Sequence, residues 1–187
     1  MATTQRHKVF VSYHHCYDEK YKRAFCEALG TDIVDKSVED GDVDISLKTD
    51  TIRQKIRDEF IADATVTVVL IGQCTWQRKH VDWEIGSSLR ETLKNSRCGL
   101  LGLLLPDHFD FDTRQYRRNL IPPRLADNSS GDNAFAAIYD WPIPWNTDRV
   151  RNWIHRAFQR RASRTPVNTR KQFARNRSGR CGDGWSD

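Results

Sequence analysis

Hydrophobic residues in this chain fall into two unbroken runs and several stripes at helical spacing. The runs cover residues 65–72 and 99–106. An apolar run of this length without polar alternation is typical of a parallel strand that helices cover on both faces. After the first run, Val81, Ile85, Leu89 and Leu93 recur every fourth residue, as in a helix that packs one face on a sheet. The pattern predicts a strand, a loop and a helix between residues 65 and 93.

The N-terminal third of the chain predicts a similar unit. Residues 8–12 are apolar over the length of a strand, and helical spacing follows from Tyr17 to Leu29. Gly30 comes next and is placed to end that helix in the left-handed conformation. Residues 32–35 are a poorly marked second strand, and the polar residues 35–50 predict a surface loop.

The remaining elements are predicted from caps and breakers. Thr49 or Asp50 is placed to cap a helix over residues 51–60. Residues 107–133 contain Pro122-Pro123 and an Asn-Ser-Ser-Gly run, which predict an irregular excursion rather than a good helix. Residues 135–139 predict an edge strand. A last helix follows, with Asn146 or Thr147 as its cap.

Alternating strands and helices with short connections predict an α/β fold. We expect three layers of the flavodoxin-like type, with about five mostly parallel strands in the order 2-1-3-4-5 and helices on both faces. Residues 1–162 would form this single domain. Residues 163–187 hold few apolar side chains and much Arg, Ser and Gly, so they are predicted to be a basic, flexible tail.

Charge is distributed unevenly along the chain. The net charge is +5, yet residues 149–187 carry eleven Lys or Arg against two Asp, so the rest of the chain is mildly acidic. A tail of this kind is usually solvated, although it can also hold nucleic acid through phosphate contacts. We expect the solvated form, with no nucleic acid as partner.

The cysteines and the hydropathy favour a cytoplasmic protein. Five cysteines without CxxC spacing fit neither a secreted disulfide framework nor a zinc ribbon, so free thiols are expected. The apolar runs are far shorter than the roughly 20 residues that cross a bilayer. No apolar leader follows the first residues, MATTQRHK, and no membrane partner is expected.

Several common enzyme classes lack their motifs. The chain has no GxGxxG, GxxxxGK[ST] or GxSxG sequence, which argues against a Rossmann dehydrogenase, a P-loop enzyme and a serine hydrolase of the usual kind. His14, His15 and Cys16 are adjacent, but no second cluster accompanies them, and no metal site is predicted.

Glu84 is the strongest candidate for chemistry. Ligands of open α/β sheets collect at the carboxyl ends of strands, and Glu84 follows such an end. An acidic residue in the first turns of a helix is also stabilised by the helix dipole alone. The neighbouring side chains suit an aromatic ligand that bears phosphates, although two Trp at this spacing can equally be core residues. These neighbours are Trp76, Arg78, His80 and Trp83.

Three segments together resemble the TIR-like family with a flavodoxin-like fold that includes ThsB of the bacterial Thoeris antiphage system. They read KVFVSY, IRQKIRDEFIADATVTVVLIG and WQRKHVDWEIGSSL, and the resemblance covers residues 8–105. It implies that Glu84 is the catalytic residue that works on NAD. It also places Ser12, Tyr13, His14 and the loop before Thr51 near the nucleotide.

The resemblance further implies cleavage of the nicotinamide–ribose bond, which gives ADP-ribose or a cyclic isomer as a signal for a downstream effector. NAD would be a substrate and not a permanently bound cofactor. Self-association or contact with other TIR-like chains is implied as well. The alternative within the same family is a non-catalytic signalling or adaptor module that acts by protein–protein interaction.

Overall fold

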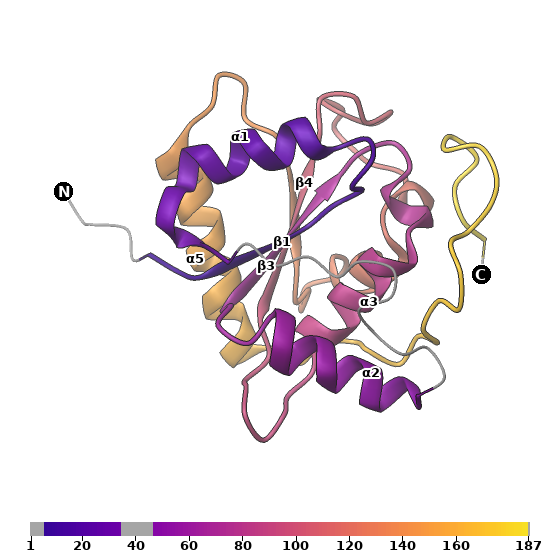
Figure 1. The fold of residues 1–187 in the computed structure, drawn as a ribbon. Coiled ribbons are helices and arrows are strands. Elements are labelled where there is room, and N and C mark those ends of the chain that lie inside the picture. The colour runs from indigo at the N-terminus through magenta and orange to yellow at the C-terminus, as the bar shows by residue number, and fades with distance from the viewer. Residues whose placement is uncertain (1–5, 35–46, 187) are drawn as a thin grey trace.

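A parallel sheet forms the centre of the molecule (Figure 1). The computed structural model describes residues 6–34 and 47–186. Four strands of four to six residues make up the body of the sheet, and a two-residue strand extends it at one edge, in the order β2-β1-β3-β4-β5. The strands are β1 (Val9–Ser12), β2 (Ile33–Val34), β3 (Val66–Ile71), β4 (Gly99–Leu104) and β5 (Ala137–Asp140). Every pair of neighbours is parallel.

The two apolar runs of the sequence are the central strands β3 and β4. All residues of both strands are buried, and their register pairs Val66 with Gly99. Successive side chains of a strand point to opposite faces. Val68 and Leu70 accordingly pack in one core, whereas Val69 and Ile71 pack in the other. This two-sided burial confirms the α/β class with a parallel sheet between helices.

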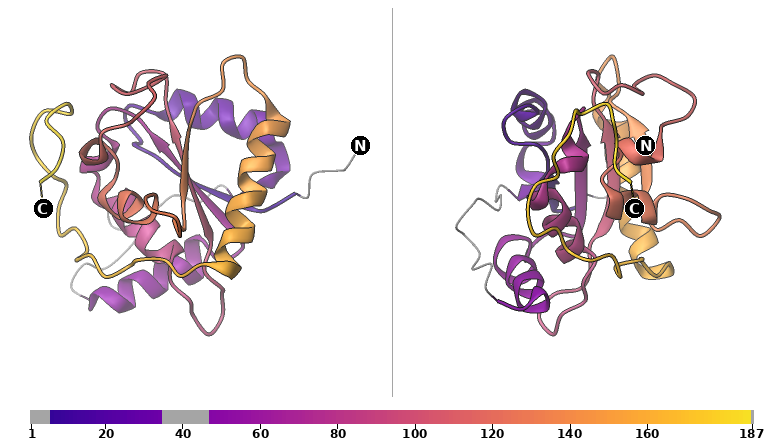
Figure 2. Two further views of the ribbon diagram at one scale, coloured as in Figure 1. Left: turned by 180° about the vertical axis from the view of Figure 1, so that it is seen from behind. Right: turned by 90° about the vertical axis from the view of Figure 1, so that its right-hand side faces the viewer.

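Helices cover both faces of the sheet (Figures 1 and 2). Helices α1 and α5 contribute to the core that contains Val68, whereas α3 and α4 contribute to the core that contains Val69. Helix α2 continues into the π-helical turn η2 and packs against Phe10 and Trp83 in a third, smaller cluster. The bounds are α1 (Glu19–Leu29), α2 (Thr49–Lys55), η2 (Ile56–Phe60), α3 (Lys79–Ser88), α4 (Pro123–Asn128) and α5 (Thr147–Ser163).

Some element ends differ from the sequence predictions. Helix α2 has Lys48 as its N-cap residue and no side-chain cap. Helix α3 ends at Ser88, so the predicted stripe is too long, and Leu93 is fully exposed beyond the helix. Gly30 has a positive φ of 60°, but its ψ of −126° lies outside the left-handed helical region. Asn146 caps α5 as predicted, since its side chain accepts a hydrogen bond from Arg149 N at 2.8 Å. Asp35 and most of the predicted 35–50 loop lie outside the described residues.

The segment expected to be irregular contains two short helical elements. These are η4 (Arg118–Leu120) and α4, which has Pro123 in its first turn. A proline is tolerated there because the first helical N–H groups have no partner within the helix. Pro123 therefore starts the short helix α4, and the two prolines do not mark an irregular loop.

The C-terminal segment, which was expected to be flexible, packs against the domain. Phe173 and Trp185 are only 9% and 8% exposed. The expectation of free thiols was also wrong for two cysteines, because Cys74 and Cys181 form a disulfide across 107 residues of sequence. Cys16, Cys26 and Cys98 are not part of a disulfide. The polar composition of the segment predicts flexibility. Two buried aromatic side chains and a disulfide nevertheless offset the conformational entropy that is lost when the segment becomes ordered.

Within the described residues, no helix is both long enough and apolar enough to cross a membrane.

The close approach of β4 and α5 gives a test of the packing. A Cβ atom at Gly99 would overlap the backbone carbonyl of Ala157 in α5. We expect Gly99→Ala to lower the free energy of unfolding by about 1–3 kcal/mol, because backbone atoms cannot move away cheaply. Gly182→Ala is the matched control, since its Cβ would meet Phe109 at an ordinary 3.4 Å. Urea unfolding measures both variants, and equal stabilities would contradict the described packing.

Candidate functional site

The structure places Glu84 beside the carboxyl end of β1. Its side chain is on α3 and its residue is 1% exposed. The hydroxyl of Ser12, the last residue of β1, donates a hydrogen bond to Glu84 Oε2 at 2.5 Å. Two residues 72 positions apart in sequence thus meet. The carboxylate lies inside the protein and does not face bulk solvent.

Polar contacts hold α3 in place beneath this pair. Ser88 Oγ donates to the backbone carbonyl of Glu84 at 2.7 Å and lies 2.7 Å from Thr67 Oγ1 of β3. Both hydroxyls are fully buried. Buried hydroxyls need hydrogen-bond partners. The contact between Ser88 and Thr67 therefore fixes where α3 lies against β3, and with it the position of Glu84 relative to Ser12.

The residues after β1 turn into the protein. The Tyr13 hydroxyl donates to Glu19 Oε2 at 2.7 Å. His14 is 4% exposed and stacks on Tyr17 with ring centroids 4.4 Å apart. Its Nδ1 has no hydrogen-bond partner within the described residues. Burial, reinforced by the charge of Arg78, lowers the pKa of His14 to about 4, so this imidazole is neutral at pH 7.

A chain of rings connects the end of β1 to α3. His15 packs on Tyr13 at 4.6 Å and stacks with His80 at 6.5 Å. His80 in turn meets the Trp83 ring edge-on at 6.0 Å. Arg78 precedes α3 in extended conformation and is partly exposed. His80 and Arg78 therefore lie at the start of α3, on the same side of the sheet edge as His14 and His15.

Trp76 and Trp83 face the C-terminal segment of their own chain. They are 3% and 4% exposed. The indole N–H of Trp76 donates to the carbonyl of Cys181 at 2.9 Å, and that of Trp83 donates to the carbonyl of Phe173 at 2.8 Å. Both rings are interior in this structure, as the alternative that they are core residues predicts. Their contact with a nucleotide stays a prediction.

Asp18 is an interior acid that the sequence analysis missed. It is 2% exposed and accepts a hydrogen bond from Thr75 Oγ1 at 3.1 Å. Thr75 Oγ1 also accepts from the backbone N–H of Gly72 at 2.9 Å, and a Cβ at Gly72 would overlap the Asp18 carboxylate. Burial raises the pKa of Asp18 to about 6, and the Thr75 hydrogen bond opposes that rise.

In sequence, Asp18 has the position of an ordinary helix cap. It is indeed the N-cap residue of α1, but its side chain caps nothing and turns to the β3–α3 loop instead. The only available signal was Gly72, where a side chain would leave no room for the carboxylate. The pair Asp18–Thr75 thus connects α1 to the loop that leads to Glu84.

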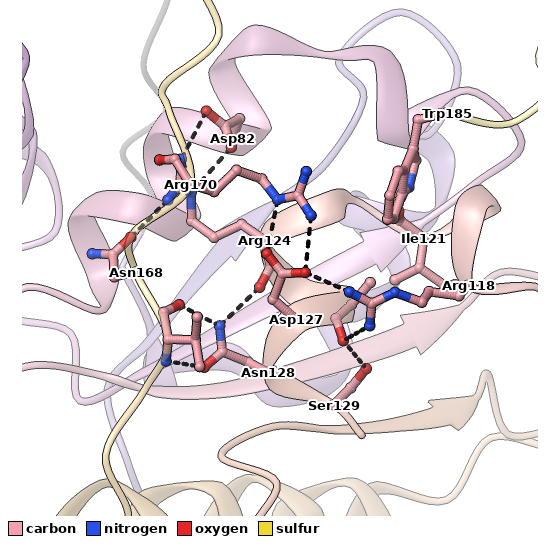
Figure 3. Close-up of polar contacts among 12 residues, drawn as sticks. Asp82, Arg118, Ile121, Arg124, Asp127, Asn128, Ser129, Asn168, Arg170 and Trp185 are labelled. Carbon is pink, nitrogen blue, oxygen red and sulfur yellow. Dashed lines mark hydrogen bonds and ion pairs between the residues drawn. The ribbon is translucent and has the colours of Figure 1, made fainter. Parts of the chain in front are cut away.

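A buried ion pair anchors the C-terminal segment to α3 and α4 (Figure 3). Arg124 Nε lies 3.1 Å from Asp82 Oδ1, and the two side chains are 0% and 2% exposed. Asp82 Oδ2 also accepts from the backbone N–H of Phe173 at 3.0 Å. Arg124 Nη2 donates to the carbonyl of Arg170 at 3.0 Å. These additional hydrogen bonds offset the desolvation of both charges.

The segment runs antiparallel along α3 and its preceding loop. Asn168 donates to the carbonyl of Gly86 at 2.8 Å, near the end of α3. Asn176 accepts from the backbone N–H of Lys79 at 2.9 Å, at the start of the helix. Arg177 N then donates to the carbonyl of Gln77 at 2.8 Å, in the 3-10 turn η3 (Thr75–Gln77). The tail therefore follows the whole element that carries Glu84.

No group of three potential metal ligands among His, Cys, Asp and Glu occurs in the described part of the chain.

The depressed pKa of His14 predicts a pH effect on stability. The unfolded histidine binds a proton near pH 6.5, whereas the folded one binds it only near pH 4. Stability is therefore present above pH 6.5 and is lost as the pH falls toward 4, by about 2–3 kcal/mol across the window.

We expect His14→Gln to remove this loss, as measured by urea unfolding at several pH values. Asp18, with its raised pKa, acts in the opposite direction over a similar range. The effect of Asp18 is the same in wild type and in His14→Gln, so it cancels in the difference between their free energies of unfolding. Parallel stability curves for wild type and variant would contradict a buried neutral His14.

Comparison with known proteins identifies the family. A family model described as "Thoeris protein ThsB, TIR-like domain" matches residues 10–108. This range begins in β1 and ends beyond β4, and it contains both Ser12 and Glu84. No curated protein matches the chain. Because the match covers more than half of the 187 residues, the chain belongs to the TIR-like domain family of Thoeris protein ThsB.

Proposed function

We propose that this protein cleaves NAD at the nicotinamide–ribose bond, with Glu84 as the catalytic residue, and that it does so as a signalling enzyme of antiphage defence in the cytoplasm. One observation carries the proposal beyond family membership. Glu84 accepts a 2.5 Å hydrogen bond from Ser12 at the carboxyl end of β1, where ligands of open α/β sheets bind. A carboxylate in that position is held in one orientation and shielded from water.

The chemistry is within reach of a single carboxylate. Nicotinamide is cationic in NAD and leaves as a neutral molecule, so no general acid has to protonate it. The main demand is to stabilise an oxocarbenium-like ribose as the bond breaks. Glu84 would accept hydrogen bonds from the ribose hydroxyls and oppose the developing positive charge, while Ser12 would keep the carboxylate aligned.

The burial of Glu84 bears on the product. Water that reaches the oxocarbenium ion gives ADP-ribose, whereas attack by another atom of the nucleotide gives a cyclic isomer. We propose that the site closes again around bound NAD and excludes water from the ribose, which favours internal capture over hydrolysis. The expected product is therefore a cyclic ADP-ribose signal, which a partner effector would detect.

The same burial implies that the enzyme at rest is closed. A ribose cannot contact Glu84 until neighbouring side chains separate. We propose that self-association or contact with other TIR-like chains, during infection, opens the site and completes it. Ser12, Tyr13, His14, Arg78 and His80 are the residues proposed to border the nucleotide, with Trp76 and Trp83 available once the C-terminal segment moves.

The alternative function is a non-catalytic TIR-like module that acts by protein–protein contact. The enclosed carboxylate and the occupied indoles of Trp76 and Trp83 favour it. In that case the hydrogen bond between Ser12 and Glu84 is purely structural. Activity measurements separate the two functions.

Glu84→Gln is the decisive variant for NAD cleavage. Purified protein is incubated with NAD, alone and with extract of phage-infected cells, and nicotinamide release is followed by chromatography. We expect the variant to lose at least about 100-fold in rate, because a neutral amide cannot oppose the charge of the oxocarbenium ion. Mass spectrometry of the same samples shows whether the nucleotide product is linear or cyclic.

Glu91→Gln is the matched control. It makes the same chemical change at an exposed carboxylate that pairs with Arg97, and it should retain wild-type activity. If wild type releases no nicotinamide under either condition, the enzyme proposal fails and the adaptor function stands. Equal release by wild type and Glu84→Gln would assign catalysis to another residue.

A further inference from the structure

Two arms of the C-terminal segment line an open hollow of about 380 Å³ beside the β3–α3 loop. One arm consists of residues 175–178 and the other of residues 184–186, with Trp76 at the base. The lining contains two arginines, an asparagine and two serines, and no Asp or Glu. Its residues are Trp76, Arg175, Asn176, Arg177, Ser178, Gly184, Trp185 and Ser186.

The arms are fixed to the domain and to each other. Between them, Cys181 is covalently linked to Cys74, and its carbonyl accepts from Trp76 Nε1 at 2.9 Å. The second arm is anchored where Trp185 N donates to the carbonyl of Asn119 at 2.9 Å. Arg177 Nη1 reaches the carbonyl of Ser186 at 3.4 Å and so connects the two arms. The hollow is therefore a constrained feature and not a chance gap in a loose tail.

Among the described residues, no carboxylate lines the hollow to compensate its positive charge. The guanidinium of Arg175 has no partner within the described residues, and that of Arg177 lies 4.6 Å from the ring of Phe173. Asp183, in the connection between the arms, pairs instead with Arg180 at 3.6 Å and does not belong to the lining. Two guanidinium groups with hydroxyl and amide donors around them suit phosphate oxygens, which accept several hydrogen bonds at once.

The tryptophans of the hollow do not offer a stacking surface. Trp76 and Trp185 are 3% and 8% exposed. The guanidinium groups of Arg170 and Arg118 cover the Trp185 ring, at 5.0 and 5.7 Å. A nucleobase therefore has no free aromatic face to stack on, and recognition would depend on the charged part of a ligand.

We propose that this hollow is a binding site for a phosphate-bearing anion, with a diphosphate group held by Arg175 and Arg177, and that the Cys74–Cys181 disulfide keeps the site assembled. The site is separate from the chemistry proposed for Glu84. The two sites share Trp76, but Arg175 and Arg177, which would bind the anion, are not among the residues proposed to border NAD, so anion binding and NAD cleavage are tested by different variants.

Calorimetric titration in phosphate-free buffer tests the proposal with three probes: inorganic phosphate, pyrophosphate and ADP. We expect pyrophosphate and ADP to bind with affinities within about threefold of each other, and inorganic phosphate to bind more weakly, because the diphosphate is the recognised group. No saturable binding of pyrophosphate would overturn the proposal. So would ADP binding that Arg175→Ala does not weaken, because ADP is part of NAD and would then occupy the site proposed beside Glu84 and not the hollow.

Arg175→Ala is the first variant, and Arg180→Ala is its matched control. Both remove one exposed arginine from the same loop, but only Arg175 lines the hollow. We expect Arg175→Ala to weaken pyrophosphate binding about five- to tenfold, as for loss of one charge-assisted contact. Arg180→Ala should change the affinity less than about twofold, since its side chain is 91% exposed and is not part of the lining. Equal losses of pyrophosphate affinity in the two variants would mean that the anion is attracted by the basic tail in general, and would overturn the proposed site.

A Cys74→Ser, Cys181→Ser double variant tests the covalent link. We expect at least the loss seen for Arg175→Ala, because without the link the arms are free to separate and must be ordered by the ligand. Circular dichroism checks that the domain is folded. Undiminished binding by the folded double variant would overturn the role given to the disulfide, and an unfolded double variant would leave Arg175→Ala as the deciding measurement.

Discussion

The parallel pairing of β1 with β3 is the constraint on which the rest of this structure depends. Strands that are buried on both faces have no place for charged side chains along their length. The hydroxyl of Thr67 within β3 is tolerated only because Ser88 of α3 is 2.7 Å away. Polar and titratable groups are therefore displaced to the strand ends, and the carboxyl ends of parallel strands lie at one edge of the sheet. The hydrogen-bonded pairs Ser12–Glu84 and Asp18–Thr75 lie there as a consequence.

Helix α3 separates two acidic residues that are only two positions apart. Residues i and i+2 of a helix point to nearly opposite sides, since each residue advances the direction by about 100°. Asp82 accordingly faces α4 and the C-terminal segment, where Arg124 and the N–H of Phe173 neutralise it. Glu84 faces β1 and bonds to Ser12. One carboxylate thus serves to hold the tail, whereas the other is placed at the strand end where a ligand would lie.

Sequence patterns were most reliable where hydrophobic burial alone decides the structure. The runs 65–72 and 99–106 became β3 and β4, and the helical stripe after Val81 became α3. Asn146 caps α5 because its short polar side chain reaches the backbone N–H of Arg149. Predictions from local breakers were weaker. Pro122 and Pro123 were read as a loop, yet Pro123 occupies the first turn of α4, a position that the same residue type also favours.

The apolar runs of β3 and β4, their burial on both faces and the position of Glu84 on a helix after β3 were determined by the sequence itself, because they depend on apolar spacing between near neighbours. Contacts between distant segments were decided only by the tertiary structure. The composition of residues 163–187 gave no sign that Phe173 and Trp185 would be buried or that Cys181 would join Cys74. Asp18 has the position of an ordinary helix cap until Gly72 and Thr75 are brought against it. The physical reason is the same in each case: the free energy of a buried charge, an aromatic anchor or a disulfide depends on its partner, and the partner is chosen by folding rather than by proximity along the chain.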